Sequence, residues 1–169
     1  MTATDLLADA FGRIREAVHE AVDGLTPEQL AFRPDGQTNS IAWLVWHLTR
    51  IQDDHIAHVA QKGQVWTVDG WADRFGLPLA PADHGYGHTA DQVATVRVKS
   101  GELLTGYHDA VYEQTIRYVR HLVDADFGRI VDESFDPPVT LGVRLISVIS
   151  DDLQHAGQAA YLHGLVLLG

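Results

Sequence analysis

The stretch LGVRLISVISDDLQHAGQAAYLHGLVL, residues 141–167, predicts a long helix and raises a question of burial. Its apolar residues recur at three- and four-residue spacing, the period of an amphipathic helix, and Thr140 is suited to cap its N-terminus. His155 is expected in the middle of the apolar side, with Asp151 one turn before it. Because an unpaired buried carboxylate is destabilising, this polar pair needs a partner in the fold.

Further helices follow from the same period, at residues 4–23, 41–61 and 102–123. Thr4 and Ser40 are suited to cap the first two of them. Thr89 with Gln92 resembles a capping box, which predicts another helix start. The sequence therefore predicts an all-α fold, a four-helix bundle formed by a single domain over residues 1–169.

A long connector, residues 63–88, separates the second and third of the four long helices and mixes glycines, prolines and aromatic residues. Connectors of this length are usually functional or packed as lids. Its HGYGH segment, residues 84–88, is expected to form a glycine turn, and its two histidines are alternative ligands or proton carriers. Strand-like alternation occurs only at residues 95–99.

Composition excludes several classes of function. The chain has 169 residues and a net charge of −11, and it shows no basic run, so neither nucleic acid nor an anionic membrane is an expected partner. It has no cysteine, which excludes disulfides, cysteine-based zinc sites and a cysteine nucleophile. Asp5 and Asp9 do not fit a signal peptide, so a cytoplasmic location is expected.

Two arrangements can stabilise Asp151 and His155 on the fourth helix. One is a salt bridge or hydrogen-bonded pair, and the other is a shared divalent cation, since helical metal sites use ligands four residues apart. The spacing alone does not decide between them. His47 lies beside the apolar stripe of the second helix and can point inward. A set of two histidines and one carboxylate leaves coordination positions open, which is typical of catalytic metal sites.

Several other side chains lie on the same helix faces as His47, Asp151 and His155, or beside those faces. Each is a candidate for a hydrogen bond to a ligand or for substrate contact, with core packing, solvation or a salt bridge as the alternative. They are Trp43, Asp54, His58, Arg144 and Asp152.

The stretches NSIAWLVWHL (39–48) and SDDLQHAGQAAYLHG (150–164) resemble the DinB/YfiT-like superfamily of metal-binding four-helix bundles. That resemblance implies His47, Asp151 and His155 as the metal ligands, with Gln158 as the glutamine that often follows them. A carboxylate at the first ligand position of the last helix is similar to the metal-binding domain of mycothiol-dependent maleylpyruvate isomerases. Their set is His–Glu–His, whereas this chain has the shorter aspartate.

The resemblance also implies an up-down-down-up helix order, a divalent metal (zinc or nickel) and a homodimer. It implies a transferase or isomerase that acts on a small-molecule substrate with a low-molecular-weight thiol. The arginine-rich, lysine-poor composition is typical of a GC-rich genome, for which mycothiol is the candidate thiol. A metal-dependent hydrolase is the alternative activity, and a non-enzymatic bundle that binds a metal or small ligand is the alternative class.

Overall fold

The computed structural model describes residues 1–168, which are mostly helical. None of the helices in that range combines the length and hydropathy needed to span a membrane. The helices are α1 (Ala3–Val22), α2 (Pro27–Leu30), α3 (Ile41–Ala60), α4 (Val65–Val68), α5 (Trp71–Phe75), α6 (Ala90–Thr95), α7 (Gly101–Val119), the 3-10 helix η1 (Asp124–Gly128) and α8 (Leu141–Leu168). The strands are β1 (Ile130–Asp132) and β2 (Val139–Thr140).

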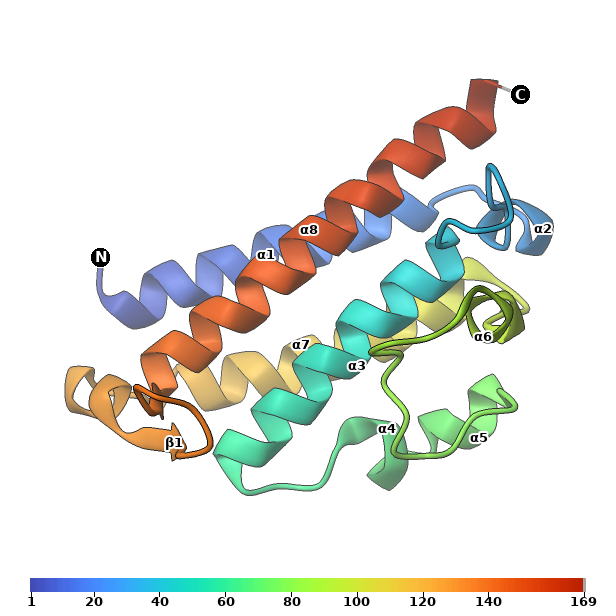
Figure 1. Cartoon of the computed structure of the whole chain (residues 1–169). Helices are drawn as coiled ribbons and strands as arrows, with labels where there is room; N and C mark the ends of the chain where they lie inside the picture. The colour runs from blue at the N-terminus through green and yellow to red at the C-terminus, as the bar shows by residue number, and fades with distance from the viewer. Residues whose placement is uncertain (169) are drawn as a thin grey trace.

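The long helices α1, α3, α7 and α8 surround one apolar core (Figure 1). Each of α1 and α3 packs against both α7 and α8. In Figure 1, α1 and α8 run in one direction along the molecule, whereas α3 and α7 run in the other. The face that α3 shares with α8 is the part of this arrangement that positions the candidate site.

Local side-chain capping explains where α1, α2, α3 and α6 begin. Ser40 Oγ accepts a hydrogen bond from the Trp43 N–H at 3.1 Å, and Thr89 with Gln92 forms a reciprocal capping box, so both predicted caps are confirmed. The prediction for α1 was wrong. Thr2 rather than Thr4 is the N-cap, because its hydroxyl accepts from the N–H of Asp5.

The strand-like alternation at residues 95–99 does not produce a strand. Val96 and Val98 are buried while Arg97 is exposed, so the alternation reflects burial in an extended segment without sheet pairing. The small sheet lies instead in the connector before α8, where β1 pairs antiparallel with β2. This short hairpin was not predicted, and the fold is otherwise helical, as expected.

The long connector contains the short helices α4 and α5, is followed by α6, and is fastened to the core by a buried polar network. The Asp53 carboxylate accepts the N–H groups of Val65 and Trp66 at 2.9 and 2.8 Å, which caps α4. It also accepts the Tyr107 hydroxyl at 2.8 Å. The Arg50 guanidinium lies 3.7 Å from Asp53, and both side chains are fully buried. The connector is therefore held against α3 and α7.

Candidate metal centre

Side chains from α3 and α8 converge on one point. His47 of α3 and Asp151 and His155 of α8 each offer one ligand atom, and these atoms lie within 4.8 Å of one another. We call these three residues the candidate metal cluster. Asp151 and His155 are one helical turn apart, so they share a face of α8, and the close packing of α3 on α8 brings His47 to that face.

The orientation of His47 is set by the long connector. Its Nδ1–H donates to the backbone carbonyl of His84. Because a carbonyl can only accept, this bond places the proton on Nδ1 and leaves a lone pair on Nε2. Burial lowers the pKa of His47 to about 4, although the bond to His84 opposes that shift. The imidazole is therefore neutral near pH 7, the form that binds metals.

His155 is oriented in the same manner from its own helix. Its Nδ1 lies 2.9 Å from the Oε1 of Gln158, which accepts the ring proton. The two imidazole ring centroids, of His47 and His155, are 4.9 Å apart. His155 Nε2 lies 3.6 Å from Asp151 Oδ1, which is too long for a hydrogen bond. Asp151 and His155 therefore do not hydrogen-bond to each other, and Nε2 of His155 is available to bind a metal.

The Asp151 carboxylate also lacks a protein partner. Its Oδ2 is buried and has no hydrogen bond within residues 1–168. Buried polar atoms are nearly always paired, so an unpaired carboxylate oxygen calls for an explanation. Two imidazole lone pairs and one carboxylate therefore face each other without a donor among them. A divalent cation that accepts nitrogen and oxygen ligands fits this set.

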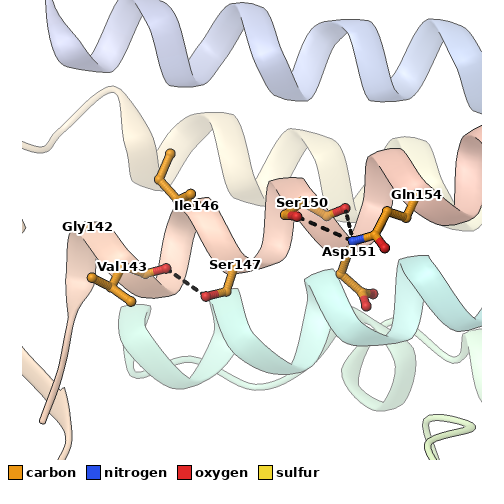
Figure 2. Close-up of a pocket in the computed structure, with 7 residues that line it drawn as sticks. All are labelled: Gly142, Val143, Ile146, Ser147, Ser150, Asp151 and Gln154. Carbon is orange, nitrogen blue, oxygen red and sulfur yellow. Dashed lines mark hydrogen bonds between the residues drawn. The ribbon is translucent and has the colours of Figure 1, made fainter. Parts of the chain in front are cut away.

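Asp151 borders an open groove that runs along α8 (Figure 2). The groove has a volume of about 610 Å³. Figure 2 shows the Asp151 side chain directed toward the neighbouring helix α3. The lining residues all come from α8: Gly142, Val143, Ile146, Ser147, Ser150, Asp151 and Gln154. The groove gives a small molecule a route to the Asp151 side of the cluster.

The cluster lies at the edge of the buried face of α8 and not in its middle, which corrects the helical-wheel prediction. The side chains of Asp151 and His155 retain 38% and 19% of their surface. Asp152 is instead the fully buried residue, and neither of its carboxylate oxygens has a partner in the described chain. Burial holds the pKa of Asp152 well above its ordinary value, with a smaller contribution from Asp151.

Trp43 lies against the candidate metal cluster. Its ring stacks on His47 with centroids 4.5 Å apart and an interplanar angle of 14°, and it lies perpendicular to the His155 ring. The indole Nε1–H donates to Nδ1 of His88 at 3.1 Å. Trp43 therefore covers one side of the His47 ring and joins it to the connector.

Other predicted residues make different contacts. Asp54 accepts a hydrogen bond from Gln64 Nε2 at 2.7 Å and so supports the connector. His58 is exposed in the last turn of α3, and Arg144 pairs with Asp132 at 2.8 Å. None of the three offers a ligand atom to the three-residue group found within residues 1–168. Solvent exposure of His58 and a salt bridge of Arg144 are among the alternatives given for these residues, and their contact with a substrate stays a prediction.

The contribution of the connector backbone was not predicted. His84 acts through its main-chain carbonyl, which no side-chain motif can indicate. The only available signal was the pair of glycines in HGYGH, Gly85 and Gly87, which both adopt positive φ. That pattern predicts a tight turn but not the element against which the turn packs.

Comparison with known proteins shows which family the chain belongs to. A crystal structure of a conserved protein from Enterococcus faecalis has 30% sequence identity and a TM-score of 0.93. The similarity covers 100% of this chain and 99% of that chain. No curated protein matches. The sequence model of the DinB superfamily matches residues 10–159, which is most of the chain, and the protein therefore belongs to the DinB superfamily.

Proposed function

We propose that the candidate metal cluster binds a divalent metal ion, zinc or nickel, and that the protein is a metal-dependent enzyme using a low-molecular-weight thiol. One observation carries the metal proposal: three ligand atoms converge within 4.8 Å with no donor among them. Membership of a superfamily that typically binds metals supports the same conclusion.

The residues of the cluster have distinct roles in this proposal. His47 and His155 are neutral ligands, while Asp151 contributes one negative charge, which leaves a divalent ion with a formal surplus of one positive charge. When bound, such an ion acts as a Lewis acid and lowers the pKa of a coordinated thiol or water. Trp43 shields one side of His47 from solvent. The groove along α8 leaves the Asp151 side accessible.

The thiol must come from outside the chain, because the sequence contains no cysteine. A transferase or isomerase of this type would bind mycothiol or another small thiol beside the ligands and present it to an electrophilic small molecule. The carboxylate in the cluster supports this choice through its similarity to the His–Glu–His set of maleylpyruvate isomerases.

The metal proposal is tested by titrating the chelator-treated protein with Zn²⁺ and with Ni²⁺ in a calorimeter. We expect one ion per chain, and we expect binding to be lost in His47→Ala and in His155→Ala. His58→Ala is the matched control, since it removes an exposed histidine from the same helix as His47. Equal affinity of all variants, or no binding by the wild type, would refute the site.

The thiol proposal is tested on protein that has first been shown to bind metal. Thiol consumption is followed with panels of small electrophiles, with and without mycothiol. Hydrolysis of esters or amides in the absence of thiol would favour the alternative hydrolase. A metal-loaded protein that turns over neither class would leave the non-enzymatic binding function.

The opposed helix directions in Figure 1 support the up-down-down-up bundle that the resemblance implies. The single domain, the homodimer and the cytoplasmic location stay predictions. Light scattering of the purified protein tests the homodimer.

A further inference from the structure

A loop far from His47 in the sequence makes direct contact with it. We call residues 83–88 the ligand-facing loop. The carbonyl of His84 accepts the Nδ1–H of His47, and His88 Nδ1 accepts the indole N–H of Trp43 at 3.1 Å. Trp43 and His47 are one turn apart on α3, so the loop bonds to two successive inward side chains.

Close approach of this loop requires glycine at position 85. Gly85 has a φ of +91°, which L-amino acids with a side chain rarely adopt. A Cβ atom there would lie 2.9 Å from His47 Nδ1, 3.0 Å from Trp46 and 3.1 Å from Trp43. The last two neighbours are buried aromatic rings that have little room to move. Any larger residue would therefore push against the very nitrogen that bonds to His84.

The ligand-facing loop has its own internal supports. The Asp83 carboxylate accepts the N–H of Gly85 at 2.8 Å and the Nε2–H of His88 at 3.0 Å. The His88 ring stacks on Trp46, with centroids 5.9 Å apart. These contacts fix the loop at both ends around Gly85, so the His84 carbonyl has a defined direction.

The loop is also tied to α3 by a buried charge. Arg50 is fully buried, and its Nε–H donates to the backbone carbonyl of Asp83 at 3.1 Å. A guanidinium nitrogen of the same side chain lies 3.5 Å from the carbonyl of Pro81. Arg50 therefore joins the loop to the helix that carries His47, one turn further along.

We propose that the ligand-facing loop is a positioning element that holds His47 in the tautomer and orientation required for metal binding. This inference rests on the proposed metal site. The physical reason is that a ring nitrogen coordinates a metal well only when the other nitrogen carries the proton and is held by an acceptor. Loss of such an outer partner typically weakens metal affinity by about 10- to 100-fold.

Gly85→Ala tests the proposal, and Gly87→Ala is its matched control. Both glycines have positive φ in the same loop, but a Cβ at Gly87 meets no atom within 4 Å in the described structure. Both variants therefore place a side chain at positive φ, at +91° and +75°, and only the first crowds His47. Zn²⁺ calorimetry should show affinity weaker by about 10- to 100-fold for Gly85→Ala, with little change for Gly87→Ala.

A second measurement reports on the loop without any metal. Nitrogen-15 NMR of the metal-free protein should show His47 protonated on Nδ1 in the wild type and in Gly87→Ala. In Gly85→Ala the His47 proton should move to Nε2, or the two nitrogen signals should average because both tautomers are populated. If the wild type shows the expected tautomer but binds no Zn²⁺, the metal site is refuted and the inference with it. If the wild type binds Zn²⁺ and Gly85→Ala binds it equally well, only the role of the loop is refuted.

Two results would overturn the inference. One is unchanged Zn²⁺ affinity and an unchanged His47 tautomer in Gly85→Ala. The other is a wild-type His47 protonated on Nε2. Should Gly85→Ala fail to fold, Asp83→Ala replaces it, because it loosens the loop without adding atoms beside His47. That variant should also lose Zn²⁺ affinity, and wild-type affinity in it would refute the role of the loop.

Discussion

His108 on α7 provides a sharp test of the packing described above. It is fully buried, and neither ring nitrogen has a hydrogen-bond partner in the described part of the chain. Burial lowers its pKa from 6.5 to about 4. The unfolded chain therefore takes up a proton before the folded protein does, so the free energy of unfolding should fall as the pH drops below 6.5. This loss is complete below about pH 4.

The magnitude follows from those two pKa values. Linkage gives a loss of about 2 kcal/mol between pH 7 and pH 5, rising to about 3 kcal/mol at pH 4. His108→Leu removes this pH-dependent loss. It also removes two unpaired polar atoms, whose burial costs about 1–3 kcal/mol. We therefore expect the variant to be more stable than wild type at pH 7, and its advantage to grow by about 2 kcal/mol at pH 5.

Urea unfolding followed by circular dichroism at pH 7 and pH 5 measures both quantities. A chelator keeps metal out of the comparison, and the titration of His47 contributes equally to both proteins. His58→Leu is the control, since His58 is exposed and its removal should not flatten the pH dependence. The prediction is contradicted if His108→Leu loses as much stability as wild type between the two pH values. It also fails if the variant is the less stable protein at pH 7.

Three further predictions concern aspartates and a glutamine. Asp151→Asn should weaken Zn²⁺ binding by at least about 10-fold in calorimetry and leave the urea midpoint unchanged; an unfolded variant would contradict this. Gln158→Ala should weaken Zn²⁺ binding by about 10-fold, whereas Gln154→Ala should not, because the Gln154 amide bonds to Ser150 and not to His155 in the described residues. Asp53→Ala should cost about 3–5 kcal/mol in urea unfolding, because Arg50 stays buried without its carboxylate. A cost below about 1 kcal/mol would mean that the backbone carbonyls of Asp83 and Pro81 stabilise the buried Arg50 charge without Asp53.

The sequence predicted the long helices well because their signals are local. Ser40 and the Thr89–Gln92 pair are read from a few adjacent residues, and the apolar period depends on one helix at a time. The α1 cap was misplaced by two residues because Thr2 and Thr4 are chemically equivalent candidates. Alternation at Val96 and Val98 reported burial correctly, but pairing with another strand depends on a partner that this segment does not have.

The candidate site was predictable only where side chains carry the signal. The spacing of Asp151 and His155 shows that they share a helix face, and the resemblance placed His47 with them. The helical wheel of α8 did not show that Asp152 would be more buried than Asp151. Asp152 is polar, so it was expected at the flank of the apolar face. The His84 carbonyl was beyond prediction, since every residue has one and its use depends on the tertiary path of the connector.

Both imidazoles of the candidate metal cluster donate hydrogen bonds to uncharged acceptors, a peptide carbonyl for His47 and a carboxamide for His155. A carboxylate in either place would draw the ring proton toward itself and enrich the ring in electrons, making it a stronger donor. A neutral acceptor increases the electron density of the ring less than a carboxylate does. A cation coordinated by these rings would stay comparatively electron-poor and would draw more strongly on whatever group occupies its remaining positions.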